Sequence, residues 1–182
     1  MAIAGPNGAG KSTFYSAQLS SANRIFVNAD VLAAQLGLGA YEAADLAENL
    51  RQTLLAERES FVFETVFSDP EGSKLAFLEK AVEQGYRVTL CYIGLGSSDT
   101  SQERVAMRVS QGGHDIPDEK LEARFPRTLE NLHKAIRSLP EVRVYDNSDL
   151  RTPYRLIAIF HLGTVVELNP PIPDWLSSSV TP

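Results

Sequence analysis

The sequence predicts a three-layer α/β fold with a mostly parallel sheet and a helical lid. Short apolar runs alternate with amphipathic stretches along the 182 residues, and this alternation is typical of parallel strands joined by crossover helices. The first apolar run leads into a glycine-rich turn that matches a phosphate-binding motif. No linker or internal repeat divides the chain, so we expect a single domain over residues 1–182.

The strands are expected where short apolar runs rich in β-branched or aromatic residues are bounded by turn-forming residues. Five such runs alternate with helices and suit a parallel sheet, and two more flank Gly163 as a terminal strand pair. In chain order, the expected strands are residues 1–4, 25–28, 61–63, 88–93, 142–145, 156–160 and 164–168.

The helices are recognised by apolar residues three or four positions apart and by their end signals. Leu46, Leu50 and Leu54 share one helical face. Thr100-x-x-Glu103 is a capping-box pattern, and Pro117 suits a first helical position. The expected helices are residues 11–19, 31–36, 41–59, 74–83, 100–110 and 117–138, followed by a surface arm over residues 169–182.

Composition excludes several classes of protein. The chain has 17 Lys and Arg against 23 Asp and Glu, and a net charge of -6 disfavours nucleic-acid binding. The single cysteine, Cys91, excludes an internal disulfide and a multi-cysteine zinc site, and it fits a reducing compartment. No apolar run approaches the length of a membrane span, and the first residues lack the basic segment of a signal peptide. We therefore expect a cytoplasmic protein without a membrane or nucleic-acid partner.

The strongest motif is the turn over residues 5–12, which matches G-x-x-x-x-G-K-[ST] in full. Glycines let successive backbone N–H groups converge on phosphate oxygens, and the helix that follows directs its N-terminus at the same anion. Lys11 is expected to reach the β- and γ-phosphates, and Ser12 to bind Mg²⁺. The sequence thus predicts ATP or GTP and Mg²⁺ as ligands of Gly5, Pro6, Asn7, Gly8, Ala9, Gly10, Lys11, Ser12 and Thr13.

A phosphate loop indicates a nucleotide but not a reaction. This form of the loop is common in ABC-transporter ATPases, which also carry a Leu-Ser-Gly-Gly-Gln-type signature and a strand ending in Asp-Glu. The chain has neither of these features, and it lacks the guanine-reading Asn-Lys-x-Asp motif. The missing motifs disfavour both of these classes.

Two acidic residues follow expected strands at the edge of the sheet where parallel sheets bind ligands. Asp30 follows the second strand and Glu64 the third. A carboxylate in this place can accept the proton of an attacking hydroxyl or hold Mg²⁺ and its water. The alternatives are that Asp30 is the N-cap of the helix over 31–36 and that Glu64 is an ordinary surface residue.

Arginines gather in residues 98–138, where two helices flank the turn Gly112-Gly113-His114. This arrangement predicts a lid that closes over the phosphates and brings arginines to the transferring phosphoryl group. Two solvated helices with ordinary surface arginines are the alternative. The residues concerned are Arg104 and Arg108 on the first helix, and Arg124, Arg127 and Asn131 on the second.

Together these motifs resemble the zeta-toxin-like branch of P-loop kinases, in particular its short bacterial members once described as predicted ABC-type ATPases. The phosphate loop is generic, whereas the Gly-Gly-His-Asp segment with its arginines is more specific. The resemblance is carried by residues 5–13, Val-Asn-Ala-Asp at 27–30, Phe-Glu-Thr-Val-Phe-Ser at 63–68, Tyr-Ile-Gly-Leu at 92–95, 104–117, 124–132 and Tyr-Asp-Asn-Ser at 145–148.

Zeta-type toxins phosphorylate the 3′-hydroxyl of UDP-N-acetylglucosamine with ATP or GTP, so the resemblance implies a small-molecule hydroxyl acceptor such as a UDP-sugar. It also implies an antitoxin protein as partner. Asp30 matches the family's catalytic base and Glu64 its second acid, while Arg108 matches one phosphate-clamping arginine and Arg124 or Arg127 could serve as the other. A P-loop NTPase without acceptor and a non-catalytic ATP-binding toxin–antitoxin module are the alternatives.

Overall fold

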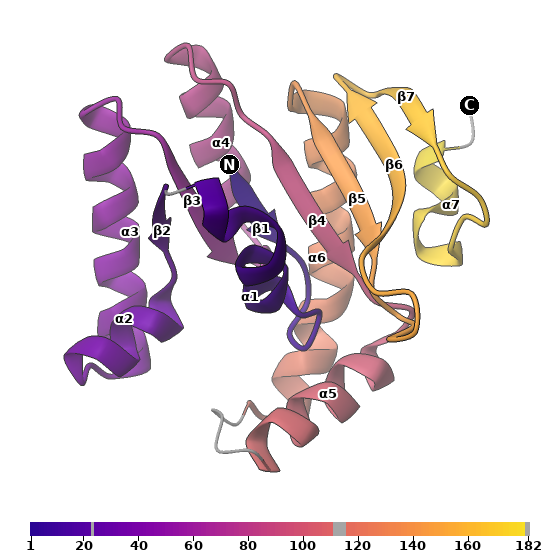
Figure 1. Ribbon diagram of the computed structural model, residues 1–182, viewed down its shortest axis with the longest axis horizontal. Helices are drawn as coiled ribbons and strands as arrows, with labels where there is room; N and C mark the ends of the chain where they lie inside the picture. Colours follow the sequence, from indigo (N-terminus) through magenta and orange to yellow (C-terminus); the bar gives the residue numbers. More distant parts are fainter. Residues whose placement is uncertain (23, 111–115, 181–182) are drawn as a thin grey trace.

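The computed structural model describes residues 1–22, 24–110 and 116–180 of the chain. Within these residues a seven-stranded sheet forms the centre, with the strand order β2-β3-β1-β4-β5-β6-β7 (Figure 1). Neighbours from β2 to β5 pair in parallel, and β6 and β7 complete the sheet as an antiparallel pair. The strands are β1 (Ala2–Ala4), β2 (Ile25–Val27), β3 (Phe61–Thr65), β4 (Leu90–Gly94), β5 (Val142–Asp146), β6 (Arg155–His161) and β7 (Thr164–Leu168).

Helices cover both faces of the sheet, which confirms the predicted three-layer α/β class (Figure 1). The side chains of β1 show the division, because Ala2 and Ala4 face one core and Ile3 faces the other, and all three are fully buried. Such strands read as continuous apolar runs, since both faces are covered. The helices are α1 (Lys11–Phe14), α2 (Ala29–Leu36), α3 (Ala40–Ala56), α4 (Ser73–Glu83), α5 (Ser98–Ser110), α6 (Asp118–Ser138) and α7 (Asp174–Val180).

The first core lies between the sheet and the helices α3, α4 and α6, and α7 contributes Leu176 to it. The second is smaller and lies under α1, where Phe14 packs with Ile3, Cys91 and Ile93. Because β1 is the middle one of the five parallel strands and α1 is the next element after it, the glycine-rich turn emerges at the middle of the carboxyl edge of the parallel part of the sheet. No helix in the described part of the chain combines the length and the apolar character that crossing a membrane requires.

The helix expected over residues 11–19 changes its character after one turn. Only Lys11–Phe14 is α-helical, and Tyr15–Leu19 forms a π-helical turn. In this wider turn the ring of Tyr15 stacks on that of Phe26 in β2, with centroids 3.6 Å apart and planes 6° from parallel. An aromatic contact across 11 residues of chain is not visible in a helical periodicity.

Three other expectations about helices are corrected. In α3, Leu46 is 36% exposed, and the buried face carries the small residues Ala43 and Ala47, against which larger neighbours can pack closely. At the start of α5 the capping residue is Ser97, three residues before the expected Thr100, since Ser97 Oγ accepts the Thr100 N–H at 3.1 Å. Within the expected arm, residues 174–180 form α7. The predicted turn over Gly112–Gly113 and His114 lies outside the described residues.

Candidate active site

The glycine-rich loop between β1 and α1 has a backbone that requires glycine. Gly10 has a φ of +83°, and a Cβ there would lie 2.8 Å from the Tyr154 hydroxyl and 3.0 Å from Asn147 Nδ2. Gly5 has a φ of +142°, and a Cβ there would lie 2.1 Å from the carbonyl oxygen of Ile93. A side chain at either place would fill space that the loop needs for its tight path. The residues present therefore fit a phosphate cradle of the P-loop type.

Three side chains hold the loop from outside. The Ser101 hydroxyl on α5 donates to Asn7 O at 2.7 Å. Asn147 Nδ2, just after β5, donates to Ala9 O at 2.9 Å, and the Tyr154 hydroxyl donates to Gly10 O at 3.0 Å. All three bonds engage carbonyl oxygens, which leaves backbone N–H groups of the loop for an anion. Sequence reasoning missed Ser101 and Tyr154, and it noted Asn147 only within the segment 145–148 that carries the resemblance.

Lys11 is buried within this loop. Its Nζ donates to Gly5 O at 3.0 Å and to Pro6 O at 2.9 Å, and it lies 4.0 Å from Glu64 Oε1. Burial lowers the pKa of Lys11, whereas the nearby charges of Glu64 and Asp30 oppose that shift. The ammonium group thus lies between the loop and both predicted acids, where it can neutralise a phosphate.

Glu64 connects several side chains on the acidic side of the site. Its Oε2 accepts hydrogen bonds from the Ser12 hydroxyl at 2.8 Å and from Asn28 Nδ2 at 2.7 Å. The structure thereby joins the start of α1, the residue after β2 and the end of β3 at one carboxylate. Sequence reasoning missed Asn28, although it stands where an N-cap before α2 could have been sought.

Asp30 is not the cap of α2. Asn28 is the N-cap, and its Oδ1 accepts the N–H groups of Asp30 at 2.8 Å and Val31 at 3.1 Å. The helix begins at Ala29, two residues before Val31, where a helix capped by Asp30 would begin. The carboxylate of Asp30 is therefore free of that role and lies exposed in the first helical turn, beside the cavity described below.

Oxygen ligands for Mg²⁺ are present at the loop. The Ser12 hydroxyl and the Glu64 carboxylate are hard donors, and Mg²⁺ typically combines one or two such protein ligands with phosphate oxygens and water. In residues 1–22, 24–110 and 116–180, no three His, Cys, Asp or Glu side chains form a group that could hold a metal by themselves. The donor set thus suits an ion that arrives with a nucleotide.

The predicted arginines separate into two groups. Arg108 on α5 is partly buried, and its charge helps to lower the pKa of Lys11, which places it on the loop side. On the same helix, Arg104 donates from Nη2 to Ser148 O at 2.9 Å. Arg124 and Arg127 on α6 instead line a cavity of about 350 Å³.

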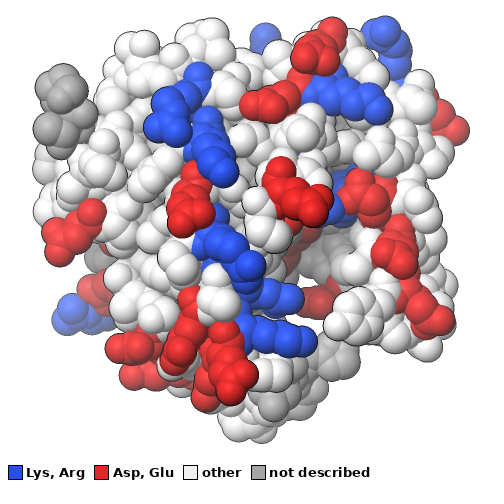
Figure 2. Space-filling model, turned by 180° about the vertical axis from the view of Figure 1, so that it is seen from behind, with Lys and Arg blue, Asp and Glu red and all other residues white. Residues whose placement is uncertain are grey.

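A second cavity, of about 210 Å³, lies beside the acids and is lined by Asp30, Glu64 and Arg51. Thr65 and Lys74 line both cavities, so the two cavities adjoin. Figure 2 shows this face of the molecule, where a hollow opens beside a column of Lys and Arg side chains that follows α6. We call the two cavities together the acceptor cleft.

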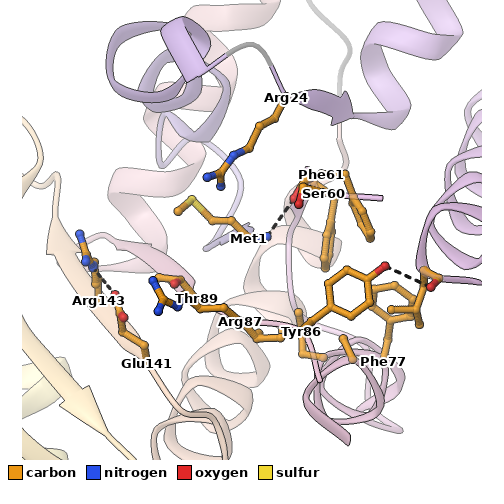
Figure 3. A pocket seen from close by; sticks show the side chains of 15 residues that line it. Met1, Arg24, Ser60, Phe61, Phe77, Tyr86, Arg87, Thr89, Glu141 and Arg143 are labelled. Atoms are coloured by element: carbon orange, nitrogen blue, oxygen red, sulfur yellow. Dashed lines mark hydrogen bonds and ion pairs between the residues drawn. The ribbon is translucent and has the colours of Figure 1, made fainter. Parts of the chain in front are cut away.

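A further cavity of about 330 Å³ lies at the opposite edge of the sheet, around Met1 (Figure 3). In it Arg143 Nε donates to Glu141 Oε1 at 2.6 Å, and the Tyr86 hydroxyl donates to Leu54 O at 3.2 Å. These polar groups already have partners within the protein. Open parallel sheets bind ligands at the carboxyl ends of their strands, so we place the candidate active site at the phosphate loop.

Comparison with known proteins identifies the family. The model of the zeta toxin family matches residues 37–155, which include Glu64, Arg108, Arg124 and Arg127. The chain belongs to the zeta toxin family. The match begins after the phosphate loop and Asp30, so the assignment of those residues depends on their own motif and geometry.

Proteins similar to this zeta toxin family member in sequence or in structure have low sequence identity to it. An uncharacterized protein of Haemophilus influenzae is 29% identical over 126 residues, which cover 66% of this chain and 88% of the relative. A chain from the PezAT chromosomal toxin–antitoxin system of Streptococcus pneumoniae superposes with a TM-score of 0.59 at 16% identity, over 87% of this chain and 69% of that one. A putative kinase from Chloroflexus aurantiacus superposes with a TM-score of 0.53 at 19% identity, over 83% of this chain and 90% of that one. The fold is thus that of P-loop kinases.

Proposed function

We propose that the protein is a kinase that transfers the γ-phosphoryl group of ATP to a hydroxyl group of a small molecule. One observation carries this proposal. The carboxylate of Asp30, which does not cap α2, lines a cavity together with Glu64, and Glu64 contacts both Ser12 and Lys11 of the phosphate loop. A carboxylate in this place can accept the proton of a hydroxyl group that approaches the nucleotide from the cleft.

In the proposed reaction the acceptor oxygen attacks the γ-phosphorus, the bond to the β,γ-bridging oxygen breaks, and ADP leaves. Asp30 accepts the hydroxyl proton. Lys11 and Arg108 offset the negative charge on the transferring group. Mg²⁺, held by Ser12 and Glu64 when bound, would neutralise phosphate oxygens.

UDP-N-acetylglucosamine is the first acceptor to test, because zeta-type toxins, which this chain resembles, phosphorylate that compound. An antitoxin protein is the proposed partner, since one structural neighbour comes from a toxin–antitoxin system. The cleft offers space for such an acceptor, because the part beside Asp30 provides about 210 Å³ and the adjoining part about 350 Å³.

The test is ADP release with Mg-ATP, with and without UDP-N-acetylglucosamine, combined with mass spectrometry of the acceptor. We expect acceptor-dependent release and a phosphorylated sugar nucleotide. Asp30→Asn should reduce transfer by about 100-fold or more while Mg-ATP binding is retained, because the amide cannot take the proton. Asp45→Asn, on the exposed side of α3, is the matched control and should behave like the wild type.

Each other result points to a different function. Unchanged turnover in Asp30→Asn would refute its role as the base. ADP release that no acceptor alters would indicate an NTPase. Nucleotide binding without ADP release would indicate a non-catalytic ATP-binding module.

A further inference from the structure

We infer that Lys74, Arg124 and Arg127 bind an anionic group of the acceptor, of the phosphate-ester class, so that the arginines of α6 recognise the acceptor and not the nucleotide. This inference rests on the proposed kinase function, because it concerns the far end of the same cleft. It differs from the sequence expectation, which assigned Arg124 and Arg127 to the phosphates of ATP.

The acceptor cleft is polarised along its length. Asp30 and Glu64 line the part next to the phosphate loop. Among the described residues, the only other charged groups at the wall of this part are Lys74 and Arg51, and Arg51 is paired with Glu48. Lys74 lies at the junction of the two parts, and the two arginines line the far part. An acceptor with a hydroxyl at one end and a phosphate at the other would lie with the hydroxyl at the carboxylates and the phosphate at the guanidinium groups. The opposite orientation would place like charges together.

The charges at the basic end are largely uncompensated. Neither Arg124 nor Arg127 forms an ion pair with a carboxylate in the part of the chain that the structure describes, and both side chains are partly buried. Arg127 Nε is buried and has no hydrogen-bond partner among those residues. Lys74 differs, because Glu48 holds its Nζ at 2.5 Å and so fixes its position at the junction of the two cavities. In a chain of net charge -6, two free guanidinium groups in one cavity indicate an anionic ligand.

One carboxylate, Asp69, also lines the basic end. Its Oδ2 accepts the Ser73 hydroxyl at 3.0 Å and the Lys74 N–H at 3.4 Å at the start of α4. This oxygen therefore already accepts hydrogen bonds from the first residues of α4. Its other oxygen is buried and lacks a partner within the described residues. A hydroxyl-bearing phosphate ester could offer a donor to such an oxygen and acceptors to the guanidinium groups.

The wall of this end is rigid, which favours binding. Asn131 on α6 is 3% exposed, and its Nδ2 donates to Phe67 O and Asp69 O, each at 3.0 Å. Phe67 has a φ of +63°, and its N–H donates to Thr65 Oγ1 at 3.1 Å. The loop between β3 and α4 is thus attached to α6 one turn beyond Arg127. Asn131, which the sequence analysis grouped with Arg124 and Arg127 on the polar side of this helix, is instead buried and holds this loop.

Inorganic pyrophosphate is a suitable probe while the acceptor is unidentified. It is titrated calorimetrically into the full chain with the nucleotide site saturated by Mg²⁺ and the non-hydrolysable analogue AMP-PNP. We expect one pyrophosphate to bind per chain. Lys74→Gln and Arg127→Gln should weaken this binding at least about 10-fold, as expected for the loss of one charge-assisted contact, with AMP-PNP affinity unchanged.

Matched controls lie on the same two helices. Lys80→Gln on α4 and Arg137→Gln on α6 remove the same charges at exposed positions outside the cleft, and should leave pyrophosphate binding unchanged. If Lys74→Gln unfolds because Glu48 loses its partner, Arg124→Gln repeats the test, since its side chain forms no ion pair within the described residues.

Three results would overturn the inference. The first is that pyrophosphate does not bind to the nucleotide-saturated wild type. The second is that the variants and their controls lose pyrophosphate affinity equally. The third is that Arg127→Gln loses affinity for AMP-PNP but keeps its affinity for pyrophosphate. The proposed function fails separately. If no hydroxyl acceptor is phosphorylated while pyrophosphate binding depends on Lys74 and Arg127, the kinase proposal is wrong and the anion site stands.

Discussion

At the scale of single residues, Asn28 organises the acidic side of the site. Its side-chain oxygen caps α2 and its side-chain nitrogen donates to Glu64 at 2.7 Å. One amide thereby holds Glu64 toward Ser12 and leaves Asp30 exposed in the first helical turn. An aspartate at position 28 could cap the helix but could not donate to Glu64, so the two tasks together require an amide.

Gly10 gives a prediction at the same scale. Gly10→Ala should lower the free energy of unfolding by about 1–3 kcal/mol, because alanine is strained at a φ of +83° and its Cβ would lie 2.8 Å from the Tyr154 hydroxyl. It should also weaken Mg-ADP binding at least about 10-fold, since the loop must shift away from Tyr154 and Asn147. Urea unfolding and calorimetric titration measure the two effects.

Gly72 provides the control, because it has a φ of +73° with no described atom within 4 Å of a Cβ. Gly72→Ala has similar backbone strain, about 1 kcal/mol, but should leave Mg-ADP affinity unchanged. If Gly10→Ala binds Mg-ADP as the wild type does, the close packing of the loop is not needed for nucleotide binding.

At the scale of elements, α3 and α4 are joined by a charged cluster under the acceptor cleft. Glu48 on α3 accepts hydrogen bonds from Arg51, Gln52 and Lys74, the last on α4. Arg51 is 4% exposed, and its guanidinium lies 5.2 Å from the centre of the Phe63 ring. A buried arginine with this partner is stable only while Glu48 is ionised.

The stability of this cluster should depend on pH. Partial burial raises the pKa of Glu48, but the hydrogen bonds from Lys74, Gln52 and Arg51 outweigh that effect and lower it from 4.5 to about 2. Because the pKa of Glu48 is lower in the folded state than in the unfolded chain, its ionised carboxylate stabilises the folded protein above pH 4.5. This contribution to the free energy of unfolding is lost as the pH falls toward 2. Glu48→Gln should therefore cost about 1 kcal/mol at pH 7, a reduced figure because the side chain is 35% exposed.

Urea unfolding from pH 7 down to the lowest pH at which the wild type remains folded measures this dependence. The difference between the wild type and Glu48→Gln should shrink as the pH falls. Glu57→Gln is the control, since Glu57 is exposed and forms no ion pair within the described residues. A difference that is independent of pH would mean that Glu48 acts through packing alone.

At the scale of the whole molecule, the C-terminal helix supports the edge that carries the phosphate loop. The Trp175 ring lies against Gly94 at the end of β4, where a Cβ would come within 2.3 Å of it. Leu176 is fully buried in the larger core. Residues 174–180 are thus joined by packing to the central strands, and we propose that the chain folds as one cooperative domain.

Leu176→Ala tests this integration. It should lower the free energy of unfolding by about 3 kcal/mol, because a fully buried leucine leaves a cavity when it is truncated. Leu168→Ala, at a position 41% exposed on β7, should cost far less. Unfolding followed by far-UV circular dichroism and by Trp175 fluorescence should give one coincident transition. Two separate transitions, or a cost below about 1 kcal/mol, would show that α7 is peripheral.

The sequence by itself determined the features that depend on residues close together in the chain. The loop over residues 5–12, the positions of the strands and the acids Asp30 and Glu64 at strand ends all follow from local spacing and from the rule that parallel sheets bind ligands at one edge. The mostly parallel sheet and the terminal strand pair around Gly163 were predicted in this way and are confirmed, and the structure shows that the pair is antiparallel.

Only the tertiary structure decided which side chains meet. Ser12 and Glu64 are 52 positions apart and Ala9 and Asn147 are 138 apart, so no local pattern links them. The helix face that is buried depends on neighbouring elements, which is why Asn131 lies inside and Leu46 outside. The same dependence places Arg124 and Arg127 in the acceptor cleft, because the cavity that the polar side of α6 borders is set by the elements around the helix.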